Sequence, residues 1–384
     1  MKGKVMKRIL MVNLPFSGHT NPTLDLARTF VDLGHEVTYI HSPTWRDKIE
    51  ATGAIFIPYD HYEAGKTAEI KSWAWAYETI KRIGQNFDCL VYEMLFTAGK
   101  ALADQLGIPS FRLFSTFALN EQVLSDCGRT GGFYLTLIFR FPILQRLLSR
   151  PLARRFGWRY TDMVREMIDN APEFNFVYTV KDFQIYPDQF PAEHYYFVGP
   201  SIGPRQENNL DFSNFPDPIV YISLGTLLND SPDFFKKCIQ AFGNQKLSVI
   251  MSIGDKIDAR KLGDIPDNIF LAPFLPQLQI LERASLFITH GGMNSVNEAL
   301  YYGVPMLVVP MGNDQPRVAQ QVVDVHVGKC LNKCSLTAQQ LQESAEELLK
   351  NKSYRKRAQA FQNKCRAAGG NQRIAQQILT ALNK

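Results

Sequence analysis

A short apolar run that passes straight into a glycine-rich turn constrains the fold of this chain more than any other feature. Residues 286–289, Leu-Phe-Ile-Thr, predict a buried strand, and His290, Gly291 and Gly292 follow it directly, ahead of a helical pattern. Glycines let a backbone approach an anion closely, and the free N–H groups at a helix start point toward that anion. A strand, a turn and a helix in this order therefore predict a phosphate site in an α/β sheet.

Polar side chains gather in and just beyond this turn. They are His290, Asn294, Ser295, Glu298, Asp314 and Gln315. A histidine at the strand end adds a donor for the phosphate, whereas Glu298 would repel phosphate and instead accept hydrogen bonds from sugar hydroxyls. The alternative is a tight turn with a structural histidine. The ordered series H-x-G-x-N-S-x-x-E, followed by P-x-x-x-D-Q, favours a nucleotide-sugar site within residues 274–315.

The rest of the chain alternates strand and helix patterns. Expected strands cover residues 9–14, 36–40, 55–58, 89–92, 110–114, 219–223, 247–251, 270–272, 286–289 and 306–309, and expected helices include 22–33, 97–106 and 234–242. Such alternation predicts βαβ units and parallel sheets. At 384 residues the chain is long enough for two domains. We expect an N-terminal domain over residues 1–200, a Pro-, Gly- and Asn-rich linker over 201–218, and a C-terminal domain over 219–384 whose last helix packs back on the first.

Composition narrows the class of protein. Hydrophobic residues make up 45% of the chain and charged residues 21%, as in soluble globular proteins. The net charge of +5 is too small to indicate nucleic-acid binding. No apolar run approaches the length of a membrane-spanning helix, and the cysteines lie mostly far apart, as free thiols do in a reducing compartment. We therefore expect a cytoplasmic protein, as a monomer or a weak dimer.

A second histidine stands at a comparable strand end in the first half. His19 follows the strand at residues 9–14, and parallel sheets bind ligands beyond the carboxyl ends of their strands. Histidine is the side chain best suited to accept a proton near neutral pH. The sequence thus places a candidate base opposite the phosphate turn, in a cleft between two domains. The alternative is that His19 only satisfies the turn ahead of the first helix.

The segment 274–315 resembles the donor-binding signature of family 1 UDP-glycosyltransferases, most closely those of the bacterial macrolide type. The resemblance extends over the whole chain: Leu14-Pro15 through Gly18-His19 and Asn21-Pro22 is similar to the N-terminal loop of that family. Residues 197–200 are similar to the end of its first domain, and residues 220–226 to the opening of its second. The resemblance implies the GT-B fold, two Rossmann-like domains that face each other across a cleft.

The resemblance also implies roles for individual residues. Phe274, where relatives often have tryptophan, and Gln277 would hold the uracil, and Glu298 the ribose. The diphosphate would be bound by His290, Asn294, Ser295, the Gly292 backbone and Thr226, and the sugar hydroxyls by Asp314 and Gln315. His19 would be the general base. The family pairs this histidine with an aspartate, and Glu93 stands at the matching position, where its extra methylene changes the reach.

The implied reaction is a single displacement with inversion, in which UDP leaves as His19 takes the acceptor proton. No D-x-D motif occurs, so we expect no metal, and the UDP-sugar is a co-substrate rather than a cofactor. The donor sugar is expected to be glucose, and the acceptor a small apolar or aromatic hydroxyl compound such as a flavonoid or macrolide.

The acceptor side is less specific. Phe16 and Phe114 are candidate contacts, with Phe56, Trp73, Trp75 and Phe117 as further aromatics. Residues 131–160, rich in Phe, Leu and Arg, fit ordinary helix packing, an acceptor pocket or membrane contact, which is the least favoured of the three. Two other functions follow: a membrane-surface lipid glycosyltransferase, or a non-catalytic nucleotide-sugar-binding helper, the latter motivated by Glu93.

Overall fold

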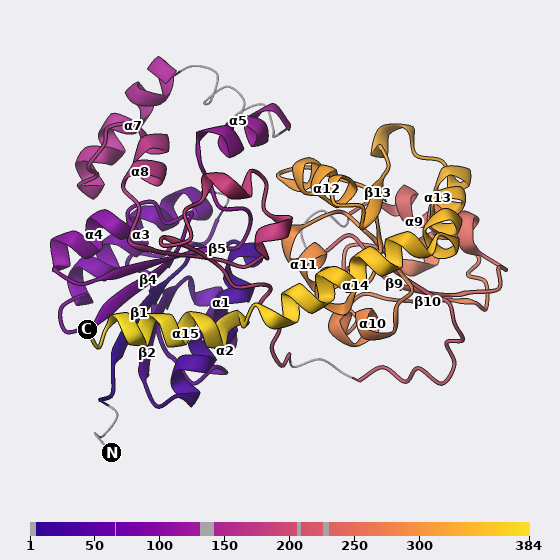
Figure 1. Cartoon of the computed structure of the whole chain (residues 1–384), viewed down its shortest axis with the longest axis horizontal. Helices are drawn as coiled ribbons and strands as arrows, with labels where there is room; N and C mark the ends of the chain where they lie inside the picture. Colours follow the sequence, from indigo (N-terminus) through magenta and orange to yellow (C-terminus); the bar gives the residue numbers. More distant parts are fainter. Residues whose placement is uncertain (1–4, 66, 131–141, 206–208, 226–229) are drawn as a thin grey trace. The chain divides into compact units, whose positions relative to one another are not determined.

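The computed structural model describes residues 5–65, 67–130, 142–205, 209–225 and 230–384. The chain divides into two compact units (Figure 1). Unit 1 contains residues 1–128, 133–203 and 368–384, and unit 2 contains residues 129–132 and 204–367. Each unit is built on one sheet whose strands pair in parallel, which confirms the two Rossmann-like domains expected from the alternating pattern.

The sheet of unit 1 has the strand order β3-β2-β1-β4-β5-β6-β7. Its strands are β1 (Arg8–Val12), β2 (Glu36–His41), β3 (Ile55–Pro58), β4 (Cys89–Glu93), β5 (Ser110–Phe114), β6 (Phe174–Val177) and β7 (Tyr195–Phe197). The order runs outward from β1 in one direction and from β4 in the other. The loops that follow β1 and β4 therefore leave the sheet in opposite directions and open a crevice at its carboxyl edge.

Helices cover both faces of this sheet. They are α1 (Ser17–Asp32), α2 (Arg46–Glu50), α3 (Ala68–Ile83), α4 (Gly99–Leu106), α5 (Glu121–Thr130), α7 (Pro142–Phe156), α8 (Met163–Asp169) and α15 (Gly370–Ala381). Successive side chains of a strand point to opposite faces. Ile9 and Met11 accordingly join one core cluster, with Phe30 of α1, while Leu10 and Val12 join the other.

The last helix, α15, belongs to unit 1 although it is far from that unit in sequence. Its residues Ile374, Ala375 and Ile378 are fully buried in the cluster that contains Phe30 of α1. Gly369 and Gly370, both at positive φ, turn the chain just ahead of it. Helices α13 and α14, by contrast, belong to unit 2.

The sheet of unit 2 has the strand order β10-β9-β8-β11-β12-β13, which again reverses beside the central strand. The strands are β8 (Ile219–Ser223), β9 (Ser248–Ser252), β10 (Ile269–Ala272), β11 (Leu286–Thr289), β12 (Met306–Val308) and β13 (Gly328–Cys330). The helices are α9 (Pro232–Phe242), α10 (Gln277–Arg283), α11 (Met293–Tyr302), α12 (Gln315–Asp324), α13 (Ala338–Lys350) and α14 (Lys352–Ala367). Within the described residues, no helix of the protein has the length and apolar character to cross a membrane.

The first helix differs from the expectation. It begins at Ser17, not at Pro22, so His19 lies in its first turn instead of in the preceding loop. Proline has no backbone N–H to donate to the carbonyl four residues earlier, so the sequence favoured a helix that begins at Pro22. Here the helix continues through Pro22, and the backbone N–H groups of His19 and Thr20 both bond to the Phe16 carbonyl.

A buried histidine, His41, ends strand β2 and has no exposed surface. Its Nδ1 accepts a hydrogen bond from the Ser42 backbone N–H (2.8 Å), and its Nε2 lies 3.0 Å from the Thr20 hydroxyl, which donates to the Leu14 carbonyl. Burial lowers the pKa of His41 to about 3, so the ring is neutral in the folded protein at neutral pH.

We predict that this neutral histidine makes unit 1 sensitive to acid. The unfolded chain takes up the proton below its pKa of 6.5, whereas the folded chain does so only near pH 3. Stability is therefore complete above pH 6.5 and is lost as the pH falls toward 3, by about 2 kcal/mol at pH 5. All four tryptophans lie in unit 1, so tryptophan fluorescence during urea unfolding reports this unit. His41→Gln should flatten the decline between about pH 7.5 and 5, and an unchanged slope would contradict the assignment.

Candidate functional site

The candidate base lies where strands β1 and β4 end side by side. Val12 of β1 pairs with Tyr92 of β4, so the chain that follows β1 reaches Glu93, the last residue of β4. His19 Nδ1 lies 2.7 Å from Glu93 Oε1. The His19 side chain is 25% exposed and the Glu93 side chain 1% exposed. The structure thus brings together the two residues proposed from the sequence, at the reversal of strand order where an open parallel sheet binds ligands.

Hydrogen bonds that involve backbone groups hold both partners of this pair in place. Glu93 Oε2 accepts the Leu95 N–H (2.9 Å), and Oε1 accepts the Ser115 N–H (3.3 Å). The His19 carbonyl receives hydrogen bonds from the Asn13 amide and the Ser115 hydroxyl, both at 3.2 Å. A carboxylate that accepts the Nδ1 hydrogen leaves Nε2 unprotonated. The arrangement can therefore accept a proton at Nε2 while Glu93 balances the charge that forms on the ring.

Glu93 reaches the histidine in spite of its additional methylene. The 2.7 Å separation is an ordinary charge-assisted hydrogen bond, neither long nor broken. Asp88, the other acid of this strand region, accepts the Arg8 backbone N–H at the opposite end of the sheet. The replacement of aspartate by glutamate is therefore compatible with the pairing.

The aromatic candidates for the acceptor separate into two groups. Phe16 is partly buried, and its ring makes an edge contact with the His19 ring at 6.3 Å between centroids. Phe114 is 1% exposed in the core of unit 1, below the Arg112 guanidinium, so it offers almost no surface to an acceptor, and the expected contact there stays an untested prediction. Phe117 is equally buried and stacks on Phe183. A ring enclosed by its own domain has no surface left for a ligand.

The phosphate turn of unit 2 closes tightly around His290. A Cβ atom on Gly225 would lie 2.7 Å from the imidazole, and one on Gly292 would lie 2.4 Å from it. Gly225 also has φ +73°, as Gly291 has φ +85°. Both the conformation and the close contact thus require glycine here. Strand β11 pairs with β8 through Thr289 and Ser223, so the turns that follow these strands meet at the second reversal of strand order.

His290 is uncharged in this turn at neutral pH. Although part of its surface is exposed, burial lowers its pKa to about 4, and a hydrogen bond with the Ser223 backbone opposes part of the shift. Helix α11 begins at Met293 with Gly292 as its N-cap, which has no side chain to bond the first N–H groups. A neutral imidazole and a helix start offer hydrogen-bond donors to an anion without a full positive charge.

Glu298, the expected ribose contact, is 4% exposed and already engaged on both oxygens. Oε2 accepts the Gln277 amide at 2.5 Å, and Oε1 forms an ion pair with Arg205. Gln277 also contacts the Ser295 hydroxyl and the Tyr221 hydroxyl, each at 3.3 Å. Gln277, Ser295 and Glu298 therefore form one connected polar group.

Arg205 is the residue of this group that sequence reasoning missed. It lies in the segment expected to be a plain linker, 93 positions before Glu298. No spacing or motif relates a single arginine in a Pro- and Asn-rich stretch to a distant helix. Only the folded chain shows that this segment contributes a positive charge beside Glu298, one of the residues expected to bind the nucleotide sugar.

The remaining residues expected to bind the donor differ in how far their side chains are exposed. Gln315 is buried, and its Oε1 accepts the backbone N–H groups of Met311 and Gly312 at 2.8 and 3.0 Å, so this oxygen supports the loop. Asp314 is partly exposed at the start of α12. Phe274 is 63% exposed, which suits a platform for a base. Thr226 lies outside the described residues, so its expected phosphate contact stays a prediction.

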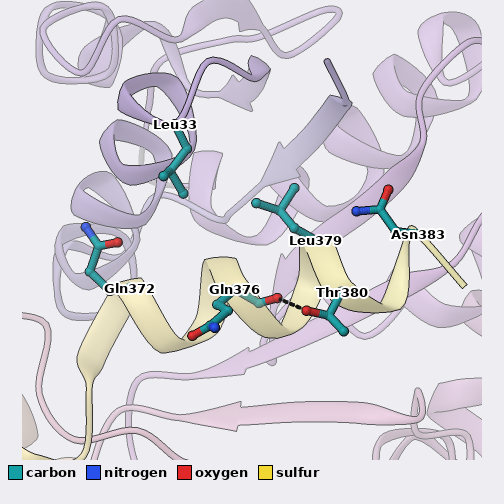
Figure 2. Close-up of a pocket in the computed structure, with 6 residues that line it drawn as sticks. All are labelled: Leu33, Gln372, Gln376, Leu379, Thr380 and Asn383. Atoms are coloured by element: carbon teal, nitrogen blue, oxygen red, sulfur yellow. Dashed lines mark hydrogen bonds between the residues drawn. The ribbon is translucent and has the colours of Figure 1, made fainter. Parts of the chain in front are cut away.

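Metal-ligand clusters and pockets are two further features that bear on the location of the site. Within the described part of the chain, no three His, Cys, Asp or Glu side chains cluster in the manner of a metal site. A pocket of about 340 Å³ lies between the end of α1 and α15, and Figure 2 shows its lining of Leu33, Gln372, Gln376, Leu379, Thr380 and Asn383. It contains no titratable side chain and none of the candidate site residues.

The chain is similar to several known proteins. Residues 236–382 match the family described as erythromycin biosynthesis protein CIII-like, C-terminal domain. The chain is 32% identical to the uncharacterized UDP-glucosyltransferase YojK of Bacillus subtilis over 99% of its length and 98% of that protein. This similarity decides the family. The chain belongs to the macrolide-type family 1 glycosyltransferases.

Two other similarities extend over nearly the whole glycosyltransferase. It is 26% identical to the oleandomycin glycosyltransferase of Streptomyces antibioticus, over 96% of this chain and 90% of that protein. The crystal structure of CalG4, the calicheamicin glycosyltransferase, is also 26% identical, with a TM-score of 0.83 over 100% of this chain and 99% of that one. The GT-B glycosyltransferase fold implied by the sequence is thereby confirmed.

The exposure of Phe274 leads to a prediction for this glycosyltransferase. Stacking of a base on an aromatic ring contributes ~1–3 kcal/mol, so Phe274→Ala should weaken UDP binding by about fivefold or more, and Phe274→Trp should preserve it. Titration calorimetry with UDP measures the change. Phe270→Ala is the matched control, because Phe270 is also an exposed phenylalanine of unit 2, at 38%, but packs on Phe215. An equal loss in both alanine variants would contradict a specific base contact.

Proposed function

We propose that this glycosyltransferase transfers glucose from UDP-glucose, with inversion, to a hydroxyl of a small apolar or aromatic acceptor such as a flavonoid or macrolide. The observation that carries the proposal is the 2.7 Å hydrogen bond between His19 and Glu93 at the carboxyl edge of the first sheet. It supports a base that takes a proton at Nε2 while the carboxylate balances the charge on the ring.

In the proposed reaction, His19 Nε2 takes the proton of the acceptor hydroxyl as the acceptor oxygen forms a bond to the anomeric carbon. The bond from that carbon to the diphosphate oxygen breaks, and its electron pair leaves with UDP. Attack from the side opposite the leaving group inverts the configuration. Hydrogen-bond donors from His290 and the start of α11 would stabilise the charge on the departing diphosphate. Glu93 would stabilise the imidazolium that results.

The donor assignment rests on residues of unit 2. Phe274 is exposed for a base, Gln277 and Glu298 are linked by a 2.5 Å hydrogen bond, and the turn at His290 suits a diphosphate. The name UDP-glucosyltransferase of the B. subtilis relative supports uridine and glucose. The acceptor assignment draws on the oleandomycin glycosyltransferase, whose name points to a macrolide.

A membrane-surface lipid glycosyltransferase is the second candidate. Its support is that Leu147 and Leu148 of α7 are 54% and 58% exposed beside several arginines. The helper-protein alternative has less support, because its motive was the glutamate at position 93, and that residue meets His19 at normal hydrogen-bond length.

Removal of the base should abolish most turnover while donor binding remains. General-base assistance contributes ~10²–10⁴-fold, so His19→Ala should lower kcat by about that factor without a change in the Kd for UDP. UDP release with UDP-glucose and a panel of flavonoids and macrolides measures turnover, and calorimetry measures binding. Turnover equal to that of the unaltered enzyme would rule out His19 as the base.

The role of Glu93 is tested separately. Glu93→Gln keeps the size of the side chain but offers the Nδ1 hydrogen a weaker, neutral acceptor, so kcat should fall by about 10-fold or more with little change in the donor KM. The limb of the pH profile that reports the base should shift to lower pH, because the imidazolium is less stabilised without the carboxylate charge and the apparent pKa of the base falls. An unchanged profile would show that Glu93 does not act on His19.

A further inference from the structure

Helix α7 of unit 1 presents an unusual surface. Its buried residues, Gln145, Ser149, Ala153 and Phe156, are spaced by four, four and three positions, so they mark the face that packs on the domain. On other faces of the helix, exposed residues form two neighbouring rows. The basic row is Arg146, Arg150 and Arg154, and the second row is Leu147 and Pro151, with Leu148 beside it. We call these six exposed residues the arginine–leucine face.

The charge on this face is largely uncompensated. Helix α7 carries four arginines and no acidic residue. Arg146 lies 3.6 Å from Asp162, and Arg155 lies 3.6 Å from Glu78. Within the described residues, the guanidinium groups of Arg150 and Arg154 have no carboxylate within 4.0 Å. Guanidinium groups that have no acid of their own chain to bind are available to phosphate, which they bind with paired hydrogen bonds.

A pocket beside the arginine–leucine face offers a binding site for an anion. It has a volume of about 290 Å³ and is lined by Arg146, Arg150, Tyr160, Thr161, Asp162 and Arg165. Its one acid is committed elsewhere, since Asp162 Oδ1 accepts the backbone N–H groups of Val164 and Arg165 and the Gln145 amide. Of the three arginines in the lining, Arg146 pairs with Asp162 Oδ2 (3.6 Å) and Arg165 with Asp169 (3.1 Å). Arg150, beside the hydroxyls of Tyr160 and Thr161, is the one without such a pair among the described residues, and it faces a space that suits a phosphate group.

The exposed leucines indicate whether this face suits a soluble polyanion or an anionic bilayer. Leu147 and Leu148 expose 54% and 58% of their surface in direct succession to the arginines. A soluble polyanion offers nothing apolar for these side chains to contact. The surface of an anionic bilayer offers both phosphate groups at the level of the arginines and acyl chains just below them. The combination of charge and exposed leucine therefore fits a membrane surface better than a nucleic acid.

We propose that the arginine–leucine face docks unit 1 on the surface of a bilayer that contains anionic phospholipid, with a headgroup phosphate in the adjoining pocket. The guanidinium groups bind the phosphates, and Leu147 and Leu148 enter the boundary of the acyl chains. The protein lies on the bilayer and does not span it. Docking does not depend on the proposed reaction, because none of these residues is a donor or base residue.

Vesicle sedimentation of the full chain tests the docking. Binding is expected to vesicles with about one third phosphatidylglycerol in phosphatidylcholine, and only weakly to phosphatidylcholine alone. Each basic residue near such a surface contributes ~1 kcal/mol, which is about fivefold in partition, so Arg150→Gln with Arg154→Gln should lower binding about 25-fold. Leu147→Gln with Leu148→Gln should lower it roughly tenfold while leaving the charge unchanged.

A charge-matched control separates a specific face from general attraction. Lys352→Gln with Lys356→Gln removes the same charge from exposed positions of α14 in unit 2 and should leave binding nearly unchanged. All changed residues are exposed, and thermal unfolding verifies that each variant is folded. Absence of binding to anionic vesicles, or an equal loss in the lysine control, would overturn the proposal. Binding that needs the arginines but not the leucines, and that polyphosphate abolishes, would assign the face to a soluble polyanion instead.

Discussion

The reversal of strand order in each sheet is the constraint on which the rest of the structure depends. In unit 1 the reversal lies between β1 and β4, and in unit 2 between β8 and β11. The connections from these paired strands leave in opposite directions, so the sheet edge stays open where they part. His19 and Glu93 lie at the first opening, and Gly225 and His290 at the second. The residues of each pair are therefore brought together by topology and not by sequence proximity.

The two openings have different electrostatic character, which matches their proposed tasks. His19 stands beside a buried carboxylate that stabilises a positive ring, as a proton acceptor requires. His290 stands in a turn that lowers its pKa to about 4, so it remains a neutral hydrogen-bond donor. One residue type thus serves two roles, and the neighbouring groups decide between them.

Several elements of the fold followed directly from local pattern. The strands at residues 9–14, 89–92 and 286–289 were predicted because continuous apolar runs are required of strands buried on both faces. The predicted start of α1 was wrong because local sequence marks Pro22 as a boundary, whereas the helix begins at Ser17, where the His19 and Thr20 N–H groups bond to the Phe16 carbonyl. Helix α3 and strands β6 and β7 were not predicted; the two strands have only four and three residues, too few for a periodic pattern.

The sequence by itself determined the strand, glycine turn and helix at residues 286–302, because that pattern is local, and it predicted from them a turn that binds a phosphate. Only the tertiary structure decided which distant groups meet. It joined Glu93 to His19 across 74 positions and Arg205 to Glu298 across 93, and it enclosed Phe114. These outcomes depend on strand order and burial, which are properties of the whole fold and leave no mark in any short segment.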